Sequence, residues 1–213
     1  MFFSCQIRGT LCIIYLKKRV KKQLPKATIY KKFDLNPASK ARFDADISRI
    51  DIVGEISEAT VSVPAGENVS SVFVLQVALK KTDFDEKNIM LISKLIDQKM
   101  IFVLTHENRA KLAVCYSRFF QTEWQNADDV SIPIRGLNLD AVYQNLITQI
   151  GAIHVTDGNT LSQQIELDEK RAKLEKEIAK LEKQARAEKQ PRKKFELVQK
   201  INQLKQTLET IRR

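Results

Sequence analysis

The sequence predicts an α/β (α+β) protein, with a small mixed β-sheet flanked by helices and followed by a C-terminal antiparallel helical hairpin. Two apolar runs, at residues 72–79 and 100–104, predict buried strands, and a helical pattern lies between them. From residue 161 onward, apolar residues recur at spacings of three, four and seven, with one interruption. This second pattern predicts the hairpin.

Length and composition are those of a globular chain. Its 213 residues are 43% hydrophobic and 29% charged, with 6 Gly and 5 Pro, which excludes collagen-like and wholly disordered proteins. We expect a basic, disordered arm over residues 1–22, an α/β globular domain over 23–160 and a coiled-coil-like helical hairpin over 161–213. No run approaches the ~18 apolar residues of a membrane-spanning helix, so no membrane contact is expected from such a span.

The arm places its positive charge after its apolar stretch, the reverse of a secretory signal. Residues 1–22 are explained by an upstream start codon, which adds residues that the fold does not need. The alternative is a functional membrane-surface segment. The three cysteines, Cys5, Cys12 and Cys115, are odd in number and lack Cys-x-x-Cys spacing. This pattern argues against a disulfide framework and a zinc site, and it predicts a reducing, cytoplasmic location.

The net charge of +10 is unevenly distributed along the chain. Residues 1–32 carry nine basic and no acidic side chains, residues 33–164 carry 12 basic and 17 acidic, and residues 165–213 carry 15 basic and 9 acidic. The flanks are therefore basic and the middle is mildly acidic. This distribution suits a polyanion or an acidic protein partner, although charged flanks also serve solubility alone.

The first expected element of the globular part is a helix that begins at Asn36-Pro37, with Asn36 as its cap. Phe43, Ile47 and Ile50 follow at helical spacing, and Gly54 ends the pattern. Residues 60–63 alternate as in a short strand.

Residues 72–79 form the best buried-strand candidate. Acids at residues 83–86 begin a helix that we expect to reach Asp97, with inward residues Ile89, Leu91, Ile92, Leu95 and Ile96. A second strand is expected at 100–104 and a turn at 107–109. The segment 112–116 is then expected to pair with the second strand as a hairpin. After a polar loop at 126–131, a helix at 137–150 is capped by Asn138 or Asp140, and residues 157–159 mark a break.

The C-terminal pattern contains two amphipathic runs. One runs from Leu167 to Ala185 and the other from Leu197 to Ile211, and Pro191 lies in the interruption between them. Basic residues gather at this expected turn: Arg186, Lys189, Arg192, Lys193 and Lys194.

Catalytic motifs are sparse. The glycine-rich loops that bind nucleotide phosphates are absent from the sequence. Cys115 and His106 are candidates for a nucleophile pair, but Cys115 lies in an apolar run, which favours a buried structural cysteine.

A metal-dependent nuclease of the restriction-endonuclease kind needs an acid and an acid-x-Lys pair at a strand end. The strand ending at Lys80 lacks a carboxylate two residues before either of its lysines, and Asp83 and Asp85 serve a helix start equally well. We assign no catalytic residue, metal or cofactor.

Trp124 is the one tryptophan of the chain and follows Phe119 and Phe120. Aromatic rings beside basic residues such as Arg118 stack on nucleic-acid bases in some proteins. The alternative is that Trp124 packs its loop onto the core.

Several dispersed segments resemble a bacterial family known as domain of unknown function 4391. They are Leu24–Thr28 (LPKAT), Val72–Lys80, Leu91–Asp97, Met100–Leu104, Thr122–Trp124, Leu137–Tyr143 and Glu188–Gln190. The resemblance spans about residues 23–213. It implies a gene setting beside helicases and DNA methyltransferases of restriction-like defence loci, which is an association and no mechanism.

We therefore hypothesise that the chain is a non-enzymatic accessory subunit. Its binding partner is either DNA or the helicase or DNA methyltransferase that acts on DNA. The candidate nucleic-acid-binding residues are Arg186, Lys189, Arg192, Lys193, Lys194, Lys80, Lys81 and Trp124. The alternatives are a divergent nuclease with Lys80, Asp83 and Asp85, and a structural protein that forms homo-oligomers through its hairpin.

Overall fold

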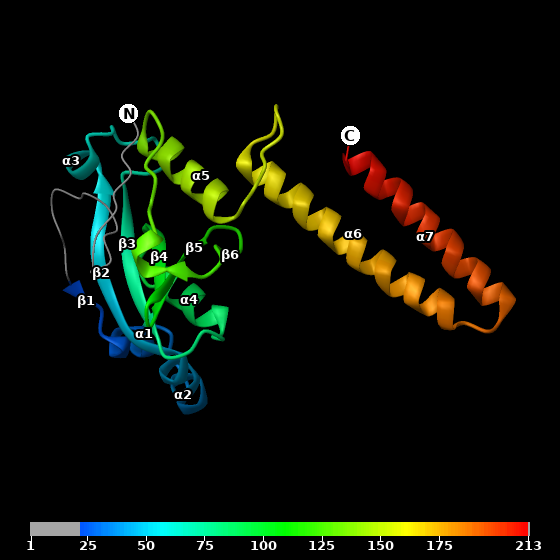
Figure 1. The fold of residues 1–213 in the computed structure, drawn as a ribbon, viewed down its shortest axis with the longest axis horizontal. Coiled ribbons are helices and arrows are strands. Elements are labelled where there is room, and N and C mark those ends of the chain that lie inside the picture. The colour runs from blue at the N-terminus through cyan, green and yellow to red at the C-terminus, as the bar shows by residue number, and fades with distance from the viewer. Residues whose placement is uncertain (1–21, 213) are drawn as a thin grey trace. The chain divides into compact units, whose positions relative to one another are not determined.

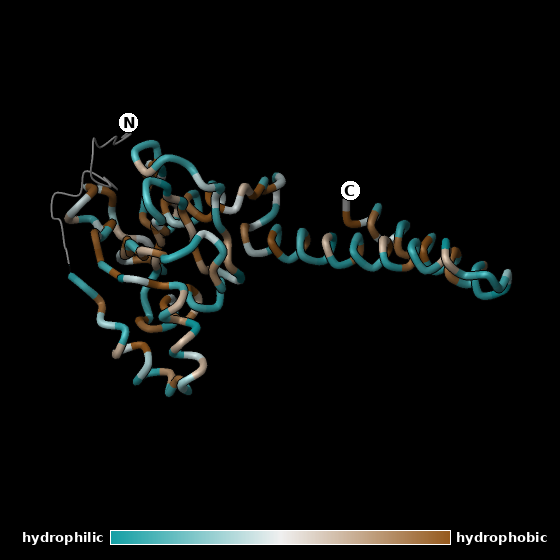
Figure 2. The backbone as a smooth tube through the Cα atoms, turned by 60° about the horizontal axis from the view of Figure 1, so that its bottom comes forward, coloured by the Kyte–Doolittle hydropathy of each residue, from teal (hydrophilic) through white to brown (hydrophobic). Residues whose placement is uncertain are grey.

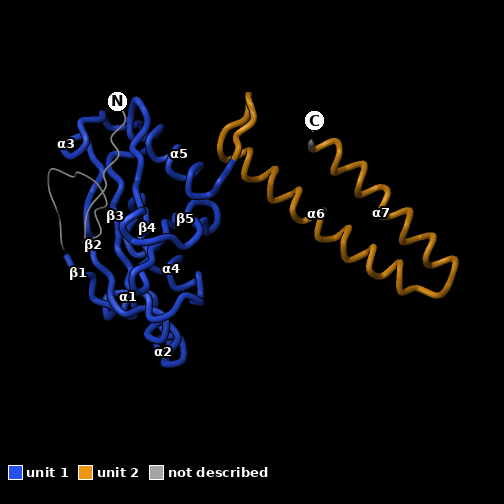
Figure 3. Tube along the Cα trace, viewed as in Figure 1, with its two compact units in different colours: residues 1–153 blue, residues 154–213 orange. Residues whose placement is uncertain are grey.

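The computed structural model describes residues 22–212 and divides into two compact units, residues 1–153 and residues 154–213 (Figure 3). We call the first unit the sheet domain and the second the hairpin. The expected arm falls outside the described residues except for Lys22, which pairs with Ile52 in the first strand. The expected fold class is confirmed.

The sheet domain is built on a mixed seven-stranded sheet (Figure 1). Its strands follow the order β1-β2-β3-β4-β5-β6, and β7 also pairs with β5. The β3–β4 pair is parallel and the other pairs are antiparallel. The strands are β1 (Lys22–Gln23), β2 (Ile47–Ser57), β3 (Ser71–Leu79), β4 (Lys99–His106), β5 (Arg109–Cys115), β6 (Phe119–Gln121) and β7 (Gln125–Asn126).

One face of the sheet is covered by three helices, α1 (Lys26–Lys32), α2 (Pro37–Asp46) and α4 (Glu86–Ser93). Ile29, Phe43 and Ile89 from these helices share a buried cluster with Leu75 and Phe102 of the sheet. Because side chains alternate along a strand, Val74 and Val103 face the opposite way. The helix α5 (Leu139–Ile150) packs on β5 and β6, and Figure 2 shows apolar (brown) segments distributed through the sheet domain.

The predicted helix over residues 36–54 is correct only in its first part. Asn36 caps α2 as expected, since its side chain accepts a hydrogen bond from the Ser39 N–H at 2.8 Å. The helix ends at Asp46, and β2 begins at Ile47. A register shift between Ile47 and Arg49 puts Ile47 and Ile50 into the same core cluster. This β-bulge gives a strand the three-residue spacing of a helix.

Two further boundaries differ from expectation. The expected strand at residues 60–63 is wrong: residues Glu58–Val61 form the short helix α3, in which the Thr60 hydroxyl accepts from the Ser57 N–H at 2.8 Å. Ser62 ends this helix in the left-handed region, at φ 57°. The helix α4 ends at Ser93, before Asp97, so Ile96 is exposed while Ile89, Ile92 and Leu95 are buried.

The other elements agree with the pattern. The strands β3, β4 and β5 and the turn between β4 and β5 lie where expected, and Asn138 caps α5 by accepting from the Ala141 N–H at 2.9 Å. The polar loop after β6 holds β7 and a short 3-10 helix, η1 (Ala127–Asp129).

The hairpin contains α6 (Leu161–Ala187) and α7 (Pro191–Arg212), which pack against each other and run in opposite directions (Figure 1). Thr160 caps α6 by accepting from the Gln163 N–H. The apolar seam between the helices consists of Leu174, Ile178, Leu181, Ala185, Leu197, Ile201, Leu204 and Leu208. This seam explains why the heptad-like repeat was readable from the sequence.

Candidate nucleic-acid interface

The turn of the hairpin is short and internally bonded. Only Glu188, Lys189 and Gln190 separate the two helices. The Glu188 N–H donates to the Gln184 carbonyl at 3.0 Å, and the Glu188 carboxylate accepts from the Gln190 N–H at 2.8 Å. Pro191 occupies the first position of α7, where a missing N–H costs nothing. The local sequence therefore fixes the turn.

Two ion pairs hold the helices of the hairpin together. Lys200 Nζ lies 3.2 Å from a Glu177 oxygen, and Lys205 Nζ lies 2.8 Å from a Glu182 oxygen. The hydrogen bond and charge of Lys205, with a smaller contribution from Arg186, lower the pKa of Glu182 below its ordinary value.

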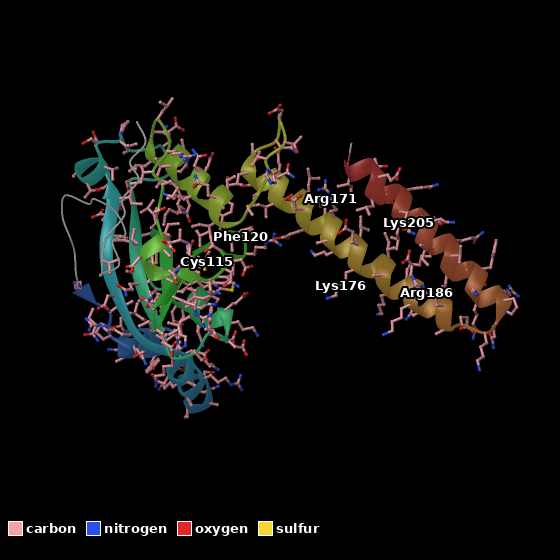
Figure 4. All side chains as sticks on the ribbon, in the orientation of Figure 1. Cys115, Phe120, Arg171, Lys176, Arg186 and Lys205 are labelled. Carbon is pink, nitrogen blue, oxygen red and sulfur yellow. The ribbon has the colours of Figure 1, made fainter. Side chains whose placement is uncertain are left out.

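The structure brings the five predicted basic residues together at this turn. We call residues 186–194 the tip. All five side chains are exposed, and Figure 4 labels Arg186 beside the turn. Arg186 lies 3.8 Å from Glu182, and Arg192 lies 3.6 Å from Glu196. Among the described residues, Lys189, Lys193 and Lys194 have no carboxylate within salt-bridge distance, so their charge is available to solvent.

A groove lies between the helices next to the tip, with a volume of 660 Å³. Its lining residues are Gln184, Ala187, Glu188, Lys193, Glu196, Leu197 and Lys200. They include two acids and two lysines. Because the lining carries both signs of charge, the groove suits a polyanion less well than the exposed basic residues of the tip do.

The two predicted lysines of the sheet domain directly follow β3, and Lys81 has a local structural role. Lys81 pairs with the buried carboxylate of Asp46, at 2.8 Å. Lys80 is exposed at the end of β3, and its backbone N–H donates to the Asp46 carbonyl at 2.8 Å.

Asp46 is a buried anchor at the end of α2. Its carboxylate accepts from the Asp85 N–H at 2.9 Å and from Asn88 Nδ2 at 2.8 Å. Burial raises the pKa of Asp46, but the hydrogen bonds and the Lys81 charge outweigh burial and bring it below its ordinary value. Asp85 itself caps α4. Asp85 is therefore used in local structure.

The sequence pattern gave Asp46 no role, because the helix was expected to continue past this residue and the start of β2 at Ile47 was not recognised. Among residues 22–212, no three His, Cys, Asp or Glu side chains gather as a group that could hold a metal ion.

Trp124 packs against the core cluster on the α1/α2/α4 face of the sheet and is partly buried. The ammonium group of Lys111 lies 4.7 Å from the Trp124 ring centroid and 4.9 Å from that of Phe84. Sequence reasoning missed Lys111, although one lysine within the apolar run of β5 was a signal. These contacts are those of a loop packed onto the core.

Cys115 and His106 are not brought together. His106 pairs with Arg109 at the start of β5, and Cys115 ends that strand six residues further along, about 20 Å away at ~3.3 Å per residue. Burial raises the pKa of the half-buried Cys115 thiol. A raised thiol pKa disfavours the nucleophilic thiolate.

Comparison with known proteins adds a family. The model of a family described as domain of unknown function, DUF4391, matches residues 17–208. The chain belongs to the DUF4391 family. The DUF4391 match covers the tip, and it includes residues 17–22, which the sequence resemblance left outside. No curated protein and no solved structure matches the chain. In the part of the chain that the structure describes, no helix is long and apolar enough to cross a membrane.

Proposed function

We propose that this DUF4391 protein is an accessory subunit that binds the phosphate backbone of DNA through the tip of its hairpin. The observation that carries the proposal is the exposure of five basic side chains around a three-residue turn, with one acid, Glu188, among them. Contacts of this kind bind without sequence preference, because every nucleotide offers the same phosphate.

The ion pairs at the tip support this role. Arg186 and Arg192 lie 3.8 and 3.6 Å from acids of their own helices, and their side chains are 83% and 93% exposed. Exposed pairs of this type contribute about 0–1 kcal/mol. Phosphate therefore competes with these carboxylates at little cost.

The partner subunit in this proposal is a helicase or a DNA methyltransferase. This part is supported by the family resemblance alone. It is tested by co-purifying the tagged full chain from its host after nuclease treatment, which removes DNA as a bridge. Recovery of neither enzyme would overturn this part and leave DNA binding as a separate question.

DNA binding is tested with a duplex oligonucleotide at a series of salt concentrations. The triple variant Arg192→Ser/Lys193→Ser/Lys194→Ser removes three charges from the tip. If all three contact phosphates, the slope of log affinity against log salt falls by about 0.9 per contact, or roughly 2–3 in total.

The matched control is Lys170→Ser/Lys173→Ser/Lys176→Ser, which removes the same charge from exposed positions of α6 away from the turn. We expect the control to change the slope by less than the tip variant does. Equal losses in the two variants would show a diffuse charge effect, and no binding by the unaltered chain at low salt would overturn the proposal.

A further inference from the structure

Phe195 lies on the outer surface of α7, just after the tip. It is 62% exposed, and Val198, one turn further along, is 40% exposed. Pro191, one turn before Phe195, is also exposed. The spacing of these three residues places them on one face of the helix, where they form a short apolar stripe.

Phe195 faces away from the seam that holds the hairpin together. At 3.6 residues per turn, Phe195 lies about 200° around the helix from Leu197, a seam residue two positions later. Phe195 is also the one aromatic residue between positions 161 and 212. The seam is built from Leu, Ile and Ala. Packing within the hairpin therefore does not account for an aromatic ring at position 195.

The immediate neighbours of Phe195 are cationic. Arg192 precedes it by one helical turn, and Lys194 precedes it directly; both are exposed. An exposed ring beside phosphate-binding cations is the arrangement that binds single strands, since unpaired bases stack on the ring while cations hold the backbone. The bases of an intact duplex are already stacked on one another and offer the ring no free face.

We propose that the tip binds single-stranded nucleic acid, with Phe195 stacking on an unpaired base and Arg192 and Lys194 holding the adjoining phosphates. This inference rests on the proposed function and names the form of its substrate. Val198 extends the apolar contact along the same face of α7. The groove between the helices is not part of this site, because Leu197, one of its lining residues, lies about 200° around α7 from Phe195.

The test compares the affinity of the full chain for one oligonucleotide, as a single strand of DNA or of RNA and as a DNA duplex, at fixed salt. Phe195→Ala and Phe195→Leu remove the aromatic face, and Leu keeps the apolar bulk. We expect both variants to lose about 5-fold or more in single-strand affinity, the lower end of the range for one stacked base. Phe195→Tyr keeps the ring and is expected to retain the affinity.

Two further readouts separate stacking from charge. The salt slope of single-strand binding should be unchanged in Phe195→Leu, because no cation is lost. The duplex affinity and the thermal midpoint of unfolding should also stay the same. If the Phe195 variants lose more affinity for single-stranded DNA than for single-stranded RNA, the ligand is DNA; a larger loss for RNA identifies RNA as the ligand.

Equal losses on single strand and duplex, or no loss in either Phe195 variant, would overturn the stacking while leaving phosphate binding intact. A chain that sediments as a dimer, and as a monomer after Phe195→Ala, would also overturn it, because the ring would then belong to contacts between copies. No binding of any strand at low salt would overturn the proposed function and this inference together.

Discussion

The ammonium group of Lys111 lies over the ring of Trp124, 4.7 Å from the ring centroid. The ring of Phe84 lies on the same ammonium at 4.9 Å. Lys111 therefore connects the loop after β3 and the loop after β6 to the central part of β5. Burial lowers the pKa of Lys111, and the charges of Glu86 and Glu123 act in the opposite direction.

Removal of the Lys111 side chain should destabilise the sheet domain. Lys111→Ala loses two cation–π contacts and the packing of the alkyl chain, so we expect the free energy of unfolding to fall by about 2–3 kcal/mol. Unfolding in denaturant measures this change in the free energy of unfolding. The control is Lys87→Ala, an exposed lysine, which should stay within about 0.5 kcal/mol of the wild type; equal effects would contradict the role of Lys111.

The fluorescence of Trp124 should not respond to DNA. The chain has 1 Trp, so the emission reports on this ring alone. Because Lys111 and the core cluster cover the ring, we expect a blue-shifted emission that stays constant during titration with single-stranded DNA. Quenching at saturating DNA would show instead that Trp124 stacks on bases.

Loss of the Asp46 carboxylate should cost more than loss of its charged partner. Asp46→Ala leaves the Asp85 N–H and the Asn88 amide without their acceptor, and we expect a loss of about 2–4 kcal/mol. Lys81→Ala removes a side chain that is 53% exposed, and we expect a loss below about 1 kcal/mol. Chemical denaturation of the two variants compares them directly, and the reverse order would show that the ion pair dominates.

The same carboxylate predicts a pH dependence. The folded-state pKa of Asp46 lies below its ordinary value of 3.8. Its contribution to stability is therefore fully present above that value and is lost as the pH falls through the folded-state pKa. Between pH 5 and pH 3, about one unit on either side of the model-peptide value, unfolding free energies should fall less steeply for Asp46→Asn than for the wild type. Parallel curves would contradict this assignment.

Removal of a competing acid next to the tip should strengthen DNA binding. Glu196 lies 3.6 Å from Arg192, so Glu196→Gln frees this cation for phosphate. An exposed helical pair contributes about 0.3–0.5 kcal/mol, which corresponds to a rise in affinity of roughly twofold at low salt. Glu209→Gln makes the same charge change near the other end of α7 and should have a smaller effect. A similar rise in both variants would point to net charge alone.

The hairpin was predictable because its stability depends on a local, repeated pattern, from Leu174 in α6 to Leu208 in α7. The strand β2 was not predictable in the same way. The bulge between Ile47 and Arg49 places Ile47 and Ile50 in one cluster at a spacing that a helix also gives, so periodicity alone favoured the wrong structure. Tertiary pairing with β3 decides that segment.

In the candidate site, too, the features that depend on local sequence were predictable and those that depend on tertiary contacts were not. The tip residues lie close together in sequence, and a charge count found them. The environment of Lys111 was hidden, because Phe84 and Trp124 come from separate segments that only the sheet brings together. Phe195 was readable as an aromatic, but its outward position depends on which residues form the seam.

The three-residue turn between Ala187 and Pro191 has a consequence for the entropy of binding. The cations Arg186 and Arg192 stand on the last and first turns of two helices, so their backbones are already ordered before any ligand arrives. A long loop with the same charges would lose about 1–2 kcal/mol per residue fixed on binding. Insertion of glycines beside Lys189 would therefore weaken binding while leaving every charge in place, which makes the tip a preorganised array of cations rather than a flexible basic tail.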